Sequence, residues 1–109
     1  MKTFNQLNIN DVLYILTECD DLYICKVTKI IESWRTKRII YDYADKYTDE
    51  MTSRYIDIPE IAFDDTSYMD SDRSCLFELY LNRNEVLEDL DKRIDILMKH
   101  KGTLNDLYK

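Results

Sequence analysis

In the last third of the chain, apolar residues recur with the period of a helix, and this pattern is the feature that most limits the possible folds. Asn82 precedes this pattern and Glu85 follows three residues later, an arrangement close to a helix capping box. Gly102, behind it, is a residue type that commonly ends helices. We therefore predict one amphipathic helix over residues 83–101. Its apolar residues recur at steps of three and four: Val86, Leu87, Leu90, Ile94, Leu97 and Met98.

Short segments between residues 12 and 81 are apolar or alternate between apolar and polar residues, as strands do. In one of them Tyr23, Cys25 and Val27 fall on the same face. The acidic segments 44–53 and 64–74 are predicted to be loops, and tight turns are expected at 18–21 and 33–36. The predicted strands are 12–16, 22–32, 37–43, 54–63 and 75–81.

Five strands followed by one helix predict an α+β fold. We expect a small antiparallel five-stranded sheet or a partly open barrel, with the helix covering an open face or end. At 109 residues the chain is expected to form a single domain, 1–109. Because no long apolar run and no signal-peptide core is present, we expect a cytoplasmic protein without membrane contact.

The segment from Leu7 to Tyr14 resembles the opening of small SH3-like barrel domains. In those domains a Leu-x-x-Gly-Asp-x-x-Tyr pattern leads into the first strand, and here Asn10 stands at the glycine position. Asn is the next-best residue for a positive φ angle, so the turn can be kept. The stretch from Phe77 to Leu97 is similar to their last strand and closing helix. Many such domains are short proteins of phages and mobile elements, and the resemblance implies no single activity.

Acidic residues concentrate between Tyr41 and Tyr80, where eleven acids and three bases give −8 in a chain of net charge −7. Such a stretch can be a solvated surface that keeps the protein soluble. It can also form a tyrosine-rich anionic face that imitates phosphates and attracts a basic protein surface. The expected partner-binding residues are Asp42, Asp45, Tyr47, Asp49, Glu50, Asp64, Asp65, Tyr68, Asp70 and Asp72, with Trp34 as an anchor.

The sequence shows no catalytic signature, so we expect no enzyme activity, no catalytic residues and no cofactor. One glycine cannot build a phosphate loop, and His100 is the only histidine. The segment 64–72 is rich in oxygen ligands but lacks the spacing of a calcium loop, so no metal site is expected there. Cys19, Cys25 and Cys75 are odd in number and form no Cys-x-x-Cys motif, which predicts thiols and not a disulfide framework.

Basic residues gather around Trp34 in the second turn and could touch nucleic acid. Because the whole chain is acidic, we nevertheless expect no direct nucleic-acid binding. The leading hypothesis is a non-enzymatic, phage-encoded, anti-CRISPR-like inhibitor. It would occlude the basic surface of a nucleic-acid-binding host protein in the host cytoplasm. Two alternatives stay open: a phage structural or assembly protein that forms a homo-oligomer, and a protein that sequesters a small nucleotide signal.

Overall fold

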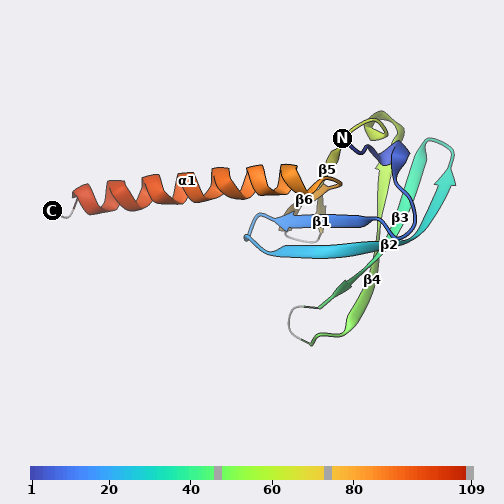
Figure 1. The fold of residues 1–109 in the computed structure, drawn as a ribbon, viewed down its shortest axis with the longest axis horizontal. Coiled ribbons are helices and arrows are strands. Elements are labelled where there is room, and N and C mark those ends of the chain that lie inside the picture. The colour runs from blue at the N-terminus through green and yellow to red at the C-terminus, as the bar shows by residue number, and fades with distance from the viewer. Residues whose placement is uncertain (46–47, 73–74, 108–109) are drawn as a thin grey trace.

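The computed structural model describes residues 1–45, 48–72 and 75–107, with the backbone alone for residues 72, 106 and 107 (Figure 1). The fold is α+β, as the sequence predicts, with an antiparallel sheet followed by one C-terminal helix. The elements in chain order are η1 (Phe4–Gln6), β1 (Val12–Thr17), β2 (Leu22–Ser33), β3 (Thr36–Ala44), β4 (Met51–Pro59), η2 (Glu60–Ala62), β5 (Ser67–Asp72), β6 (Cys75–Tyr80) and α1 (Arg83–Leu107).

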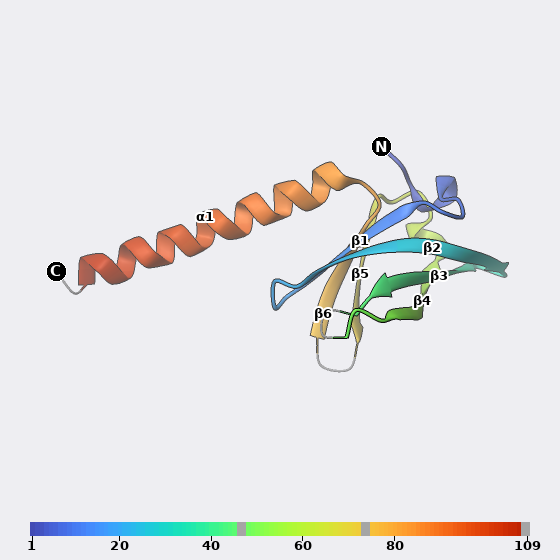
Figure 2. The same cartoon turned by 60° about the horizontal axis from the view of Figure 1, so that its bottom comes forward.

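The sheet has six strands in the order β4-β3-β2-β1-β6-β5, and every neighbouring pair is antiparallel. It curls into a half-barrel, so that β4 and β5 are its two edges (Figure 2). A register shift between Val27 and Lys29 marks a bulge in β2, and bulges increase local twist. The tight turns predicted at 18–21 and 33–36 are confirmed, with Asp20 and Arg35 at positive φ.

The predicted count of five strands is wrong because much of the expected loop 64–74 is strand β5. Its sequence is mostly polar and lacks the alternation by which strands are recognised. As an edge strand it pairs on one side with β6, where Tyr68 lies opposite Leu79 and Asp70 opposite Phe77. The ladder with β6 therefore makes this segment a strand, although its own residue preferences do not. The other predicted loop, 44–53, overlaps the ends of two strands, because β3 continues through Ala44 and β4 begins at Met51.

The core fills one end of the half-barrel. The face predicted from alternation is confirmed for Cys25 and Val27, which are buried together with Ile39 of β3 and Leu79 of β6. The N-terminal segment closes this end by inserting the fully buried Phe4. Other buried members of the cluster are Leu7, Leu13, Ile15, Tyr41, Ile56, Ile58, Ala62 and Leu81.

Hydrogen bonds hold the N-terminal segment in place. The Phe4 amide donates to the Asp65 carbonyl at 3.2 Å, and the buried Lys37 ammonium donates to the Phe4 carbonyl at 3.1 Å. The side chain of Asn82 exchanges two 3.0 Å hydrogen bonds with the backbone of Lys2. Asn82 therefore fastens the N-terminus and does not form the predicted capping box with Glu85.

Helix α1 projects away from the sheet, and the molecule is correspondingly long, at 59 × 33 × 24 Å (Figures 1 and 2). Only its first turns pack on β1 and β6, through Val86 and Leu90. Further along, Ile94, Leu97 and Met98 are 53%, 60% and 67% exposed. The prediction that the helix covers an open face or end of the sheet therefore holds only for its first turns, where Val86 packs with Leu16 and Tyr80, and the rest of the stripe stays exposed.

The helix is also longer than predicted. It continues through Gly102 to Leu107 instead of ending near residue 101. Glycine lowers helix stability without forbidding helical geometry, so Gly102 is a weak stop signal when no left-handed turn follows. No helix in the described ranges has the length and apolar character needed to cross a membrane.

Candidate functional site

Sheet topology brings three acidic turns to one end of the half-barrel. Successive hairpins of an antiparallel sheet alternate between its two ends. The β1–β2 turn, the β3–β4 loop and the β5–β6 hairpin therefore share one end, whereas the β2–β3 tip lies at the other (Figure 1). In the sequence, segments 18–21, 45–50 and 70–75 hold eight acidic and two basic residues. We call this end the acidic mouth: Glu18, Asp20, Asp21, Asp45, Asp49, Glu50, Asp70 and Asp72.

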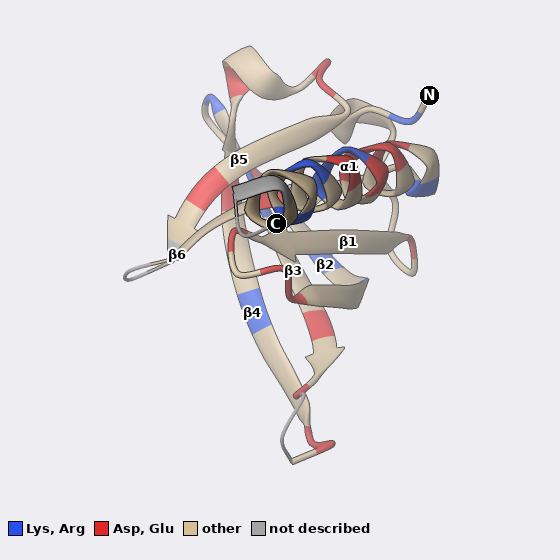
Figure 3. Ribbon diagram, turned by 90° about the vertical axis from the view of Figure 1, so that its left-hand side faces the viewer, with Lys and Arg blue, Asp and Glu red and all other residues tan. Residues whose placement is uncertain are grey.

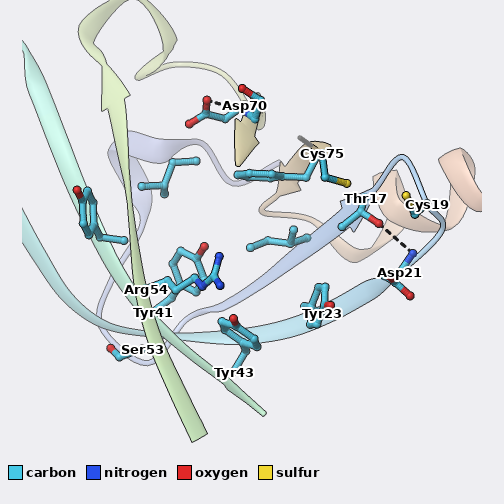
Figure 4. A pocket seen from close by; sticks show the side chains of 15 residues that line it. Thr17, Cys19, Asp21, Tyr23, Tyr41, Tyr43, Ser53, Arg54, Asp70 and Cys75 are labelled. Atoms are coloured by element: carbon cyan, nitrogen blue, oxygen red, sulfur yellow. Dashed lines mark hydrogen bonds between the residues drawn. The ribbon is translucent and has the colours of Figure 1, made fainter. Parts of the chain in front are cut away.

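A groove of about 630 Å³ opens at the acidic mouth, between the two edges of the sheet (Figure 4). Residues 53–56 of β4 form one bank, and Asp70 and Ser71 of β5 form the other. Within the described strands, β4 and β5 each have a single strand neighbour, so each presents its outer edge. The groove is thus the seam where the barrel remains unclosed.

Aromatic side chains line the floor of this groove. Tyr23 and Tyr43 pack edge to face with ring centroids 5.3 Å apart, and Tyr41 and Phe77 lie nearby. Tyr41 is buried, whereas Tyr23, Tyr43 and Phe77 are half-buried and remain accessible from the groove. The floor therefore offers rigid apolar area together with phenol hydroxyls that can form hydrogen bonds.

Local hydrogen bonds fix several carboxylates of the acidic mouth. Asp45 Oδ1 accepts from the Thr48 amide at 3.3 Å, and Asp70 Oδ1 accepts from the Ser71 amide at 2.7 Å. Asp49 adopts a φ of 57°, a left-handed conformation that Asp tolerates better than most residues. These hydrogen bonds hold the carboxylates of Asp45 and Asp70 against the backbone of their own turns.

A second group of acids joins the mouth to the helix. The Arg93 guanidinium donates to Asp20 and to the Thr17 carbonyl, both at 2.8 Å. The Tyr80 hydroxyl lies 2.5 Å from an Asp89 oxygen and 2.8 Å from a Glu78 oxygen. Burial makes the largest contribution to raising the pKa of Tyr80, and the two carboxylates raise it further. The hydroxyl therefore stays protonated and can donate a hydrogen bond. These contacts anchor the start of α1 and leave the groove itself unoccupied by the helix.

The predicted site residues divide between the two ends of the sheet. Asp64, Asp65 and Trp34 lie at the end opposite the mouth, and β4 spans about 26 Å between the ends at about 3.3 Å per residue. The acidic segments in Figure 3 show the same separation. The predicted site residues that lie at or near the mouth are Asp45, Asp49, Glu50, Asp70 and the backbone of Asp72.

Four predicted residues have other surroundings. Asp42 lies on the convex face of β3 opposite Lys26, because its neighbours Tyr41 and Tyr43 face the groove. Tyr68 packs against the core. Trp34 is 82% exposed at the β2–β3 tip, with the Arg35 guanidinium 4.2 Å from its ring. Tyr47 lies outside the described residues.

Asp64 and Asp65 serve the N-terminal segment. The Asp64 carboxylate accepts a hydrogen bond from the Asn5 side chain at 2.8 Å, and the Asp65 carbonyl accepts from the Phe4 amide. These two acids therefore have a structural explanation at the closed end of the half-barrel.

Sequence reasoning missed two parts of the site. It assigned 18–21 only to a turn, although counting hairpins would have placed this turn beside 45–50. It did not name Tyr23, Tyr43 or Phe77 as site residues, although they line the groove while packing against the core. The usable signal was the change along the inward faces from Val and Ile near one end to Tyr and Phe near the other.

Among the residues that the structure describes, no three His, Cys, Asp or Glu side chains cluster in a way that could hold a metal ion. Comparison with protein-family models, with curated proteins and with solved structures finds no match to this chain.

Proposed function

We propose that this protein is a non-enzymatic binding module that docks on a basic surface of another protein. An extended segment of that partner, bearing Lys or Arg, enters the groove between β4 and β5. The observation that carries the proposal is an open, aromatic groove, lined by Asp21 and Asp70 together with Arg54, at the end of the sheet that holds the three acidic turns.

Three physical effects support this mode of binding. The outer edges of β4 and β5 can pair with an extended chain, as in β-strand addition. Tyr23 and Tyr43 supply contact area at low entropic cost. The acids of the mouth accelerate the approach of a basic partner and disfavour an acidic one.

The partner class follows from the charge. Basic surfaces of this kind are typical of proteins that hold nucleic acid, so docking here would occlude such a surface without contacting nucleic acid directly. The resemblance of Leu7–Tyr14 to SH3-like domains of phages favours one version of the proposal: an anti-CRISPR-like inhibitor acting in the host cytoplasm. The φ of 74° at Asn10 and the curled antiparallel sheet support an SH3-like relationship.

The test compares two triple variants with equal loss of charge. Asp49→Asn, Glu50→Gln and Asp70→Asn neutralise the mouth, and Glu60→Gln, Asp64→Asn and Asp65→Asn neutralise the opposite end. The probe is a synthetic peptide of alternating arginine and valine, titrated by calorimetry at low and at high salt.

At about 0.5 kcal/mol for each exposed charge contact, three losses at the mouth should weaken binding roughly tenfold and flatten its salt dependence. The control variant should stay within about twofold of the unmodified protein. Equal weakening by both variants would show that only net charge matters and would refute a site at the mouth.

We propose a homo-oligomer formed through α1 as the second candidate, because its apolar residues follow a heptad. Six positions along the helix follow each other at alternating steps of three and four residues. Leucine or isoleucine occupies five of these positions, and Lys101 occupies the remaining one. The first part of the helix is acidic, whereas Lys99 and Lys101 near its end are basic, which favours antiparallel pairing of two copies. The apolar positions are Leu87, Leu90, Ile94, Leu97 and Leu104.

Light scattering on the purified protein tests this candidate. Leu97 and Ile96 are similarly exposed, at 60% and 55%, but only Leu97 belongs to the heptad. Leu97→Asp should convert a dimer to a monomer, and Ile96→Asp should leave the dimer intact. An unmodified protein that stays monomeric at every concentration would exclude this candidate.

A further inference from the structure

The register of the sheet brings two cysteines close together at the acidic mouth. Strands β1 and β6 pair up to Thr17 opposite Phe77, and the Glu18 amide then donates to the Leu76 carbonyl at 2.9 Å. One residue further on each side come Cys19, in the turn that follows β1, and Cys75, the first residue of β6. Directly opposed residues of antiparallel strands have Cα atoms about 4.5–5.5 Å apart, within the range of about 4.4–6.8 Å that a disulfide spans. The two cysteines therefore lie just beyond a ladder whose spacing is compatible with a disulfide.

The two side chains also share a face. Ile15, Thr17 and Cys19 line the groove from β1 and its turn, and Phe77 and Cys75 line it from β6, as the two-residue period of a strand requires. In Figure 4 the sulfurs of Cys19 and Cys75 point toward each other. Cys19 is exposed and Cys75 is half-buried, so an oxidant can reach this pair.

The surroundings of the pair differ from those of the third cysteine. The neighbouring Cys75 thiol makes the largest contribution to raising the pKa of Cys19. Burial and the negative charges of Glu18 and Asp21 raise this pKa further. Cys25 is buried in the core, where desolvation raises its pKa to about 12. Cys25 therefore serves as an internal control that should not react while the protein is folded.

We propose that Cys19 and Cys75 are a modification site, at which a reversible disulfide cross-links the β1–β2 turn to the β5–β6 hairpin. The cysteines are free in this structure. The oxidant we name is a small-molecule disulfide without negative charge, such as cystamine, whose two ammonium groups suit the acidic mouth.

The chemistry proceeds by two exchanges. One of the two thiolates attacks the oxidant, which breaks its S–S bond and releases one cysteamine. The other thiolate then attacks the protein sulfur of the mixed disulfide and releases the second cysteamine. The two electrons and two protons that the protein loses are recovered in the two cysteamine thiols. The cross-link does not depend on the proposed binding function, although it would lie at the rim of the same groove.

The experiment treats reduced, folded protein with cystamine and reads the product by intact mass and non-reducing peptide mapping. We expect the loss of two hydrogens, one cross-linked peptide pair containing Cys19 and Cys75, and an unmodified Cys25. Cys19→Ser and Cys75→Ser should each give a single cysteamine adduct in place of the cross-link. Cysteamine adducts without a cross-link, a cross-link that includes Cys25, or covalent dimers would overturn the proposal.

Thermal melting provides a second readout. A bond between residues 19 and 75 closes a long loop in the unfolded chain, so the oxidised protein should melt about 5–15 °C higher than the reduced protein. A cross-link that lowers the Tm would mean that the native geometry does not accommodate it, which also overturns the proposal.

Discussion

Phe4 determines which end of the half-barrel is closed, and Phe4→Ala tests that role. Its ring is fully buried at the end opposite the acidic mouth. Removing a buried Phe ring costs about 3–5 kcal/mol, which includes the cavity left behind. With an unfolding entropy of about 2.1 cal/mol/K per residue, the 109-residue chain should lose roughly 4 °C in Tm for each kcal/mol. The expected fall in Tm is therefore about 13–22 °C.

Circular dichroism melts and amide exchange are the assays. Exchange at Ile39 and Ile58, which are fully buried in the same cluster, should accelerate in the variant. The matched control is Ile61→Ala, because Ile61 follows the adjoining strand but is 92% exposed, and its Tm should change by less than about 2 °C. If Phe4→Ala lowers the Tm no more than the control does, the N-terminal segment does not close the core.

Three further predictions concern the rest of the fold. The Arg38 guanidinium lowers the pKa of Asp57. Asp57→Asn should therefore cost about 0.5 kcal/mol at pH 7 for this exposed pair, and the cost should disappear as the pH falls below about 4 toward the folded-state pKa, measured by urea unfolding. Tyr80→Phe should cost about 1–1.5 kcal/mol and speed amide exchange in the first turns of α1, whereas unchanged exchange would argue against anchoring by this hydroxyl. Gly102→Ala should stabilise the helix by about 0.5–1 kcal/mol, because a Cβ there meets nothing within 4 Å, and the ellipticity at the helical band should become more negative.

Features that depend on residues close together in the chain could be predicted from the sequence alone. The alternation of Tyr23, Cys25 and Val27 fixes which side of β2 faces inward, because side chains of a strand alternate. The turn at Asp20 and the positive φ at Asn10 follow from residue types that tolerate this conformation. These preferences are local, so they are visible without the rest of the molecule.

Features that depend on distant partners could not be predicted in the same way. Strand β5 exists because β6 lies beside it, and its own residues indicate a loop. The stripe through Ile94 and Leu97 correctly predicts a helix, but a periodic pattern does not state what covers it. Likewise, Gly102 stops a helix only where the chain turns behind it.

The candidate site shows the same limit at a larger scale. The acids between Tyr41 and Tyr80 are contiguous in sequence, but β4 carries the chain from the mouth to the opposite end between Glu50 and Asp64. The acids of the first turn, around Asp21, then join those of the later turns. Charge density along the chain is the basis on which we propose a basic partner, whereas the strand order shows which acidic turns lie at the same end.

The central claim is that a basic, extended segment binds in the groove between β4 and β5. The most direct measurement is a titration of isotopically labelled protein with the arginine–valine peptide at low salt, followed by NMR. The account predicts that the largest amide shifts fall on residues 53–56, on Asp70 and Ser71, and on the floor at Tyr23 and Tyr43. Shifts confined to the opposite end around Trp34, or no shifts at low salt, would contradict it.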